Sequence, residues 1–252
     1  MTETHALLSL IAETVLQKAA LDQGFDIELG ERDGWLHFES TQTPVTLALT
    51  TDNAGGWVAA LSSQAVVAEL GRTERHASVS PPSGTIATFT VPSAAVLHSL
   101  LRRARMLGRA LPTRPLDQFT KKAGGLPRST EAERMVVQRV GQNIFRDALL
   151  EYWNGRCPLT GIDDPALLRA SHIKPWAACT DDAERLDVYN GLLLAPHLDA
   201  AFDAGLISFE DDGRVIASPK LSDANRYRLS LDNLPILAIS SLHKTFMAWH
   251  RR

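Results

Sequence analysis

Cysteine is nearly absent from this chain of 252 residues, where it occurs only as Cys157 and Cys179. Two thiols cannot build the disulfide framework that holds many small secreted domains together. No apolar run approaches the roughly 18 residues that a membrane-spanning helix needs. The first residues carry acidic side chains and no basic cluster before an apolar stretch, so they predict an amphipathic helix rather than a signal peptide. Together these absences lead us to expect a cytoplasmic protein with no membrane segment.

The chain also lacks a basic excess overall, since its formal net charge is −3. The charge is unevenly distributed, however, with +8 in residues 101–146, −7 in residues 1–100 and −4 in residues 147–252. A basic segment between acidic ones is a candidate phosphate-binding strip. Its first arginines are candidate DNA contacts: Arg102, Arg103 and Arg105. The alternative is a solvated basic helix that pairs with the acidic N-terminal part.

Apolar spacing indicates a small α+β domain over residues 1–112. A helical period predicts a first helix over residues 3–23. A short helix is expected in SQAVVAEL and a longer one in SAAVLHSLLRRARMLGRAL. Alternating segments predict strands in FDIELG, WLHFES, PVTLALT, GWVAALS and TIATFTV. Asp33-Gly34 between the first two strands is typical of a β-hairpin turn. No catalytic motif stands out in this part of the chain.

Prolines and glycines concentrate in the segment that follows, which also keeps a basic character. They occur at Pro112, Pro115, Gly124, Gly125 and Pro127. These prolines and glycines predict a basic linker, followed by the start of a helix, over residues 113–140. The Thr130 to Glu133 spacing is that of a capping box. It opens a helix that we expect to run to about Trp153, with Val136, Val137, Val140, Ile144, Phe145 and Leu149 facing inward.

The most informative stretch contains three blocks, namely SHIKPW from residue 171, NGLLL from residue 190 and FDAGLISF from residue 202. In order and spacing these blocks resemble the HNH endonucleases, whose ββα-metal fold is two strands and a helix around one divalent cation. The resemblance implies a nuclease domain over residues 141–252. It implies that the first strand ends near His172, that the second is Leu192-Leu193-Leu194, and that the helix starts near Pro196.

The resemblance also implies roles for two side chains. His172 is at the position of the general base, and a neutral imidazole can take a proton from water near pH 7. An isolated histidine of this kind would more simply be a hydrogen-bonded strand end. Asn190 is at the position of a residue that braces the loop and orients the base. Asn-Gly is also a hairpin-turn dipeptide, and the two interpretations are compatible.

For the metal, the resemblance points to Asp199 and Asp203, which lie nine and thirteen residues after the asparagine. Carboxylates four residues apart share one face of a helix, and hard oxygen ligands suit Mg²⁺ or Mn²⁺. Alternatively, these acidic residues bind no metal and only interact favourably with the helix dipole. His197 is a rival ligand. Ser171 stands where many relatives have a ligand before the base, which leaves the ligand set open.

A structural zinc is not expected, because relatives that hold one have four cysteines where this chain has only Cys157. The packing of aromatic and apolar side chains must then stabilise this region, with four candidates: Trp153, Leu168, Trp176 and Phe202. Three cations are candidate phosphate contacts: Arg169, Lys174 and Arg185. The alternative for each of the three is an ordinary surface charge that contacts no phosphate. His243 and His250, in a terminal helix, are expected at the surface.

The sequence therefore predicts an α+β metal-dependent DNA endonuclease, and the resemblance suggests a restriction or defence role with residues 1–112 recognising the target. Two alternatives remain open. One is a non-catalytic DNA-binding protein with a degenerate HNH scaffold, and the other is a toxin-like nuclease with an N-terminal protein-interaction domain. Because one HNH site cuts one strand, a homodimer is a further expectation.

Overall fold

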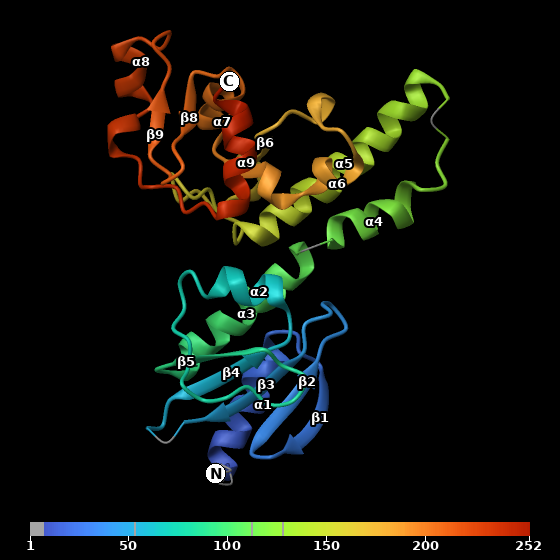
Figure 1. Ribbon diagram of the computed structural model, residues 1–252, viewed down its shortest axis with the longest axis vertical. Coiled ribbons are helices and arrows are strands. Elements are labelled where there is room, and N and C mark those ends of the chain that lie inside the picture. The colour runs from blue at the N-terminus through green and yellow to red at the C-terminus, as the bar shows by residue number, and fades with distance from the viewer. Residues whose placement is uncertain (1–7, 53, 112, 128) are drawn as a thin grey trace. The chain divides into compact units, whose positions relative to one another are not determined.

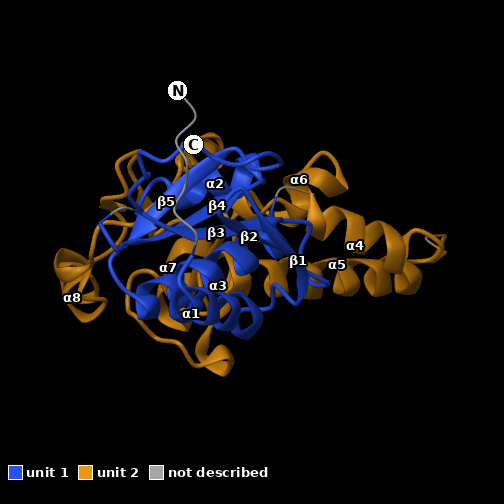
Figure 2. Cartoon of the chain, turned by 90° about the horizontal axis from the view of Figure 1, so that it is seen from below, with its two compact units in different colours: residues 1–111 blue, residues 112–252 orange. Residues whose placement is uncertain are grey.

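The computed structural model describes residues 8–52, 54–111, 113–127 and 129–252. The chain forms two compact units, residues 1–111 and residues 112–252, coloured separately in Figure 2. Each unit has its own helices and antiparallel strands, so the expected α+β class is confirmed. No helix within the described ranges is both long and apolar enough to cross a membrane.

The first unit is built on an antiparallel sheet whose five strands follow one another in chain order (Figure 1). The strands are β1 (Ile27–Arg32), β2 (Trp35–Glu39), β3 (Leu47–Thr51), β4 (Trp57–Leu61) and β5 (Ala87–Val91). The predicted hairpin joins β1 to β2, and both of its turn residues have positive φ, 51° at Asp33 and 78° at Gly34. Two left-handed residues match the twist of the flanking strands, which explains why Asp-Gly stands there.

Three helices complete this unit, α1 (Leu10–Asp22), α2 (Gln64–Leu70) and α3 (Ala94–Ala110). Helices α1 and α3 pack side by side and contact strands β2 to β5 (Figure 2). A separate apolar cluster is formed by Trp35, Ala48, Val58 and Ala60, against which Ala77 and Val79 pack. The start of the first predicted helix, residues 3–7, lies outside the described residues.

The expected linker is instead largely helical. Helix α4 (Arg114–Ala123) packs on α5 (Glu131–Tyr152), and Phe119 of α4 is buried. Pro115 is in the first turn, where its missing N–H costs no hydrogen bond. The prolines and glycines of this segment thus mark the ends of helices. The predicted capping box is present at Thr130. Val136 was wrongly expected to face inward. It is exposed, because the buried stripe of α5 begins one residue later, at Val137.

The predicted two-strand and helix arrangement is present. Strand β6 (Arg169–His172) pairs antiparallel with β7 (Gly191–Leu194), and α7 (Pro196–Asp203) follows. The connection between the strands holds η2 (Trp176–Ala178), α6 (Asp182–Leu186) and η3 (Val188–Asn190). The interpretation of Asn-Gly as a hairpin turn is wrong, because Asn190 ends η3 and Gly191, with an extended φ of −148°, opens β7.

The remaining elements lie around this core. They are η1 (Pro165–Leu167), β8 (Ile207–Phe209), β9 (Val215–Ala217), α8 (Asp223–Arg228), η4 (Leu231–Asn233) and α9 (Ser241–His250). Helix α9 packs on β8 and η3. The expectation of surface histidines in α9 is wrong. His243 is fully buried, and His250 stacks on Phe202 with ring centroids 3.8 Å apart, because this helix docks on the domain core.

Candidate active site

His172 ends β6 and is half-buried between two aromatic side chains. Its ring stacks on Phe145 of α5, with centroids 3.8 Å apart and planes 15° from parallel. The Trp176 ring lies nearly perpendicular to it, with the ring centroids 5.7 Å apart. The Nε2 atom lies 2.9 Å from the backbone oxygen of Arg185. Since a carbonyl oxygen only accepts, Nε2 carries the proton of the neutral ring and Nδ1 is left with a free lone pair.

The surroundings of His172 keep the ring neutral. Burial lowers the pKa of His172 below its ordinary value, while the hydrogen bond to the Arg185 carbonyl and the charge of Asp203 act in the opposite direction. Desolvation disfavours the charged imidazolium because a partly apolar pocket solvates charge poorly. The side chain is therefore an unprotonated base near pH 7.

Asn190 is fully buried and ties together the two ends of the connection between the strands. Its Oδ1 accepts from the backbone N–H of Lys174 at 2.7 Å. Its Nδ2 donates to the backbone oxygens of Lys174 at 3.1 Å and Glu184 at 3.2 Å. Glu184 directly precedes Arg185, whose carbonyl holds the histidine, so the asparagine fixes the position of that carbonyl.

Asp199 and Asp203 lie one helical turn apart on α7 and close to the end of β6. The Ser171 hydroxyl donates to Asp203 at 3.1 Å. Burial raises the pKa of Asp199, and the charge of Asp203 raises it further, while a hydrogen bond with Ser171 and the charge of Arg169 lower it. Because the charge of Asp203 disfavours the charged form of Asp199, a cation between the two carboxylates would relieve this repulsion.

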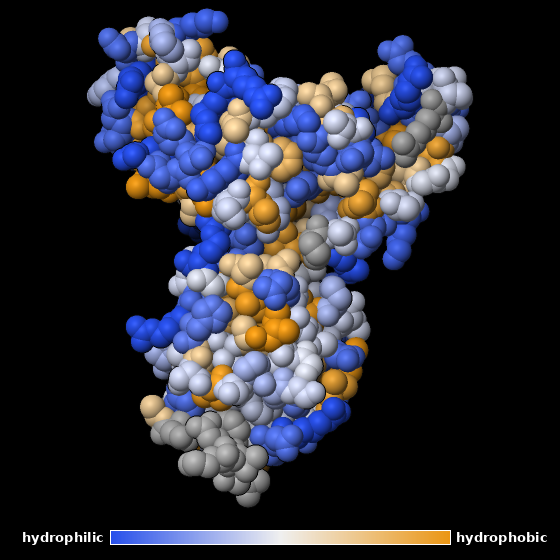
Figure 3. Space-filling model, in the orientation of Figure 1, coloured by the Kyte–Doolittle hydropathy of each residue, from blue (hydrophilic) through white to orange (hydrophobic). Residues whose placement is uncertain are grey.

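Hard carboxylate oxygens are the donors that Mg²⁺ and Mn²⁺ prefer, so this pair fits such an ion. In the described part of the chain no group of three or more His, Cys, Asp and Glu side chains could hold a metal. The structure thus does not bring His197 into one ligand group with Asp199 and Asp203. His197 is exposed and lines a hollow of about 280 Å³ with Leu221 and Arg228. Figure 3 shows apolar surface near α8 and β9.

Residues 157–210 match the family model described as HNH endonuclease. This segment of the chain belongs to the HNH endonuclease family. The match contains His172, Asn190 and both carboxylates, and it spans β6, β7 and α7. No curated protein matches the chain. The family assignment covers about a fifth of the sequence, so it characterises the HNH segment and not residues 1–111.

Two of the candidate DNA-binding cations within the HNH segment are engaged by the segment itself. Lys174 Nζ pairs with Glu184 Oε1 at 2.6 Å, with both side chains mostly buried. Arg185 donates to the backbone oxygens of Trp176 and Cys179 and to the Asp182 carboxylate. These side chains therefore hold the connection between the strands in place.

The other candidate cations differ in exposure. Arg169 is exposed at the start of β6, where it donates to the backbone oxygens of Ala166 and Leu168. Arg102 is exposed on α3, and Arg103 is half-buried. Arg105 donates to Gln42 at 3.0 Å and so helps to hold the first unit together. Arg169 and Arg102 are the candidates whose side chains are most accessible to a phosphate.

Sequence reasoning missed the contribution of α5 to the site. Phe145 supplies the ring that covers His172, and it was expected only as one of several inward-facing apolar residues. Arg146, in the same helix, donates to the backbone oxygens of Leu168 and Pro165 and so holds the segment that leads into β6. Helical spacing marks such positions as buried or exposed but does not say which partner they meet.

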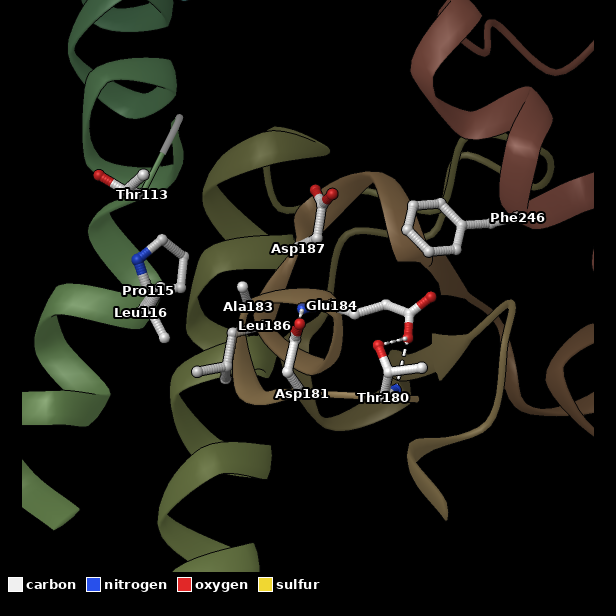
Figure 4. Close-up of a pocket in the computed structure, with 10 residues that line it drawn as sticks. All are labelled: Thr113, Pro115, Leu116, Thr180, Asp181, Ala183, Glu184, Leu186, Asp187 and Phe246. Carbon is white, nitrogen blue, oxygen red and sulfur yellow. Dashed lines mark hydrogen bonds between the residues drawn. The ribbon is translucent and has the colours of Figure 1, made fainter. Parts of the chain in front are cut away.

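A hollow beside α6 is separate from the candidate active site. It measures about 430 Å³, lies between α4, α6 and α9, and is lined among others by Thr113, Asp187 and Phe246 (Figure 4). Neither His172 nor the two aspartates line it. The candidate active site is instead at the end of strand β6 and along one face of helix α7.

Proposed function

We propose that the HNH domain hydrolyses phosphodiester bonds in DNA, with His172 as the general base. The observation that carries this is the hydrogen bond from His172 Nε2 to the Arg185 carbonyl, since it leaves Nδ1 unprotonated. The pKa of His172, lowered by burial, keeps that atom available at neutral pH. The match of residues 157–210 to HNH endonucleases supports the choice of substrate.

In the proposed reaction His172 Nδ1 takes a proton from a water molecule as the water oxygen attacks phosphorus. The bond from phosphorus to the leaving sugar oxygen breaks on the opposite side, and solvent returns a proton to that oxygen. The imidazolium formed is stabilised by the Arg185 carbonyl and by the negative charge of Asp203, both of which favour the protonated ring. Loss of this proton to solvent restores the base.

Asp199 and Asp203 would hold one divalent cation, Mg²⁺ or Mn²⁺, which supplies neutralisation of the charge that develops on the leaving oxygen. The hydrogen bond between Ser171 and Asp203 fixes one of these carboxylates relative to the strand that carries His172. Family resemblance supports a restriction or defence role in the cytoplasm, with the sheet unit of residues 1–111 selecting the target. Since one site cuts one strand, a homodimer would cut both.

The test is cleavage of supercoiled plasmid by the full chain with Mg²⁺ or Mn²⁺. The wild type is expected to convert the plasmid to nicked and linear forms. His172→Ala is expected to lower the rate by about 10²- to 10⁴-fold, the usual contribution of a general base. The control His98→Ala removes a histidine of the first unit that contacts Gln23, and it should cleave like wild type. Equal products from His172→Ala and wild type would refute the catalytic role.

One observation favours a second candidate, a DNA-binding protein without catalysis. The side chain before the base is Ser171, a weak metal ligand, and within the described residues no three-membered ligand group forms. Gel-shift titration of the same plasmid fragments separates the two. Metal-independent binding with no cleavage under any divalent ion would support the binding protein.

A further inference from the structure

Helix α5 ends at Tyr152, before the segment that matches the HNH family begins, yet it forms one wall around His172. Its Phe145 side chain is almost fully buried and lies face to face with the imidazole. The adjoining Trp153 donates from its indole nitrogen to the backbone oxygen of Gly191, at 3.2 Å. The helix is thus joined directly to both strands of the HNH core.

Gly191 makes the face-to-face contact possible. A Cβ atom at this position would collide with the tip of the Phe145 ring and with both methyl groups of Leu149. The backbone of Gly191 is extended, with φ of −148°, a conformation that any residue can adopt. The glycine is therefore required for space and not for its backbone freedom.

Gly141, one helical turn before Phe145, plays the same part for the second aromatic ring. A Cβ atom there would collide with the outer edge of the Trp176 indole. Trp176 in turn lies nearly perpendicular to His172, with ring planes 88° apart. The Arg185 guanidinium lies over the same indole, 5.8 Å from the ring centroid. Two glycines thus seat two aromatic rings, one stacked on the imidazole and one perpendicular to it.

We propose that Phe145 and Trp176, seated by Gly191 and Gly141, form an aromatic clamp that positions His172. The clamp holds the ring in the plane in which Nε2 meets the Arg185 carbonyl, so that Nδ1 is the atom left for the substrate. This inference rests on the proposed function for its effect on rate, and it makes α5 part of the nuclease domain. Phe145 and Trp176 are positioning residues, since they act through the histidine.

The decisive variant is Phe145→Leu in the full chain, which keeps an apolar side chain but removes the ring face. A matched control is Phe89→Leu, because Phe89 stacks on His76 in the first unit with centroids 4.7 Å apart and is also buried. Both variants remove a buried Phe that stacks on a His, but only the first removes the stack on His172. Thermal melting of each shows whether it is folded at the assay temperature.

For Phe145→Leu we expect a loss of about 10- to 100-fold in single-turnover cleavage rate, since small misplacements of a reacting group are this costly. The acid limb of its pH–rate profile should move to higher pH, because the imidazole is better solvated. The hydrogen bond to the Arg185 carbonyl and the charge of the Asp203 carboxylate, which both act on the ring, are retained in this variant. Phe89→Leu should keep the wild-type profile.

A titration of the histidine ring signals by NMR makes the clamp testable even without cleavage. The pKa of His172 should be higher in Phe145→Leu than in wild type and unchanged in Phe89→Leu. If the wild type fails to cleave while this shift is seen, the proposed function fails and the clamp stands. If folded Phe145→Leu keeps both the wild-type rate and the wild-type pKa, the clamp is refuted.

Gly141→Ala supplies an independent variant. Alanine favours a helix over glycine, so this substitution alone would not be expected to unfold α5. Its methyl group would displace Trp176 from its position beside His172, and we expect a lower cleavage rate in a protein that melts near the wild-type temperature. A wild-type rate in folded Gly141→Ala would overturn the part of the clamp assigned to Trp176.

Discussion

The Nε2 atom of His172 lies 2.9 Å from the backbone oxygen of Arg185, and this hydrogen bond determines which ring nitrogen can act as a base. The oxygen is held in turn by Asn190, whose side chain donates to the preceding carbonyl, that of Glu184, at 3.2 Å. His172 and Asn190 are thereby coupled through one short helix, α6. Several measurable consequences follow from this coupling.

The cleavage rate should depend on the protonation of His172. Because burial lowers the pKa of this histidine, the rate should rise with pH through a midpoint below the ordinary histidine value and then level off. Single-turnover rates between pH 4.5 and 8 at saturating Mn²⁺ measure this midpoint. A midpoint above the ordinary value would contradict the assigned environment.

Stability should depend on pH in the same range. A histidine with a lowered pKa in the folded state binds fewer protons than in the unfolded chain, so its stabilising effect is present above the unfolded pKa of about 6.5. It is lost as pH falls through that value toward the folded pKa. Burial lowers the pKa of both His172 and His250, so the melting temperature should fall below about pH 6.5. His172→Asn should reduce this fall, measured by thermal melts.

Asn190→Asp should damage both stability and activity. The new carboxylate can still accept from the Lys174 N–H but faces the Lys174 and Glu184 carbonyls with no donor. Leaving buried carbonyls unsatisfied costs about 1–3 kcal/mol. We expect a lower midpoint in chemical unfolding and slower cleavage. Asn225→Asp on the exposed helix α8 is the matched control, and it should change neither.

Replacing Asp199 with asparagine should stabilise the protein without metal and weaken its response to metal. Without metal, Asp199→Asn removes the repulsion with Asp203 and should raise the melting temperature in EDTA. With metal, the same variant should need more Mn²⁺ for half-maximal cleavage. His197→Ala should leave the melting temperature near that of wild type, because His197 lines a separate hollow. It should change the Mn²⁺ concentration for half-maximal cleavage by no more than about twofold. A large loss of Mn²⁺ affinity in His197→Ala would restore it as a ligand.

Salt dependence of DNA binding separates structural from phosphate-contacting cations. Arg169→Ala should reduce the slope of log K against log salt by about one, the signature of one lost phosphate contact. Lys174→Met should leave the slope unchanged but lower stability by about 1–2 kcal/mol, because Lys174 is paired with Glu184 at 2.6 Å. Fluorescence anisotropy with a labelled duplex gives the slopes. A lower slope in Lys174→Met would show that this lysine contacts DNA.

The sequence by itself determined the local elements and the HNH segment. The Asp33-Gly34 turn, the capping box at Thr130 and the order β6, β7, α7 all follow from contacts within a few residues or from motif blocks with fixed spacing. Local hydrogen bonds and hydrophobic periodicity depend on short stretches of sequence, so one sequence suffices to predict them.

Only the tertiary structure decided what each site residue faces. His197 and Asp199 are two residues apart, but one lines an apolar hollow and the other lies near Ser171 and Asp203. Phe145 was one apolar helix position among several until its ring was found on His172. The sequence leaves Lys174 with no identified partner, whereas the structure pairs its ammonium group with the Glu184 carboxylate. Such partners are brought together from distant segments by packing, and a local pattern records burial but not the identity of the neighbour.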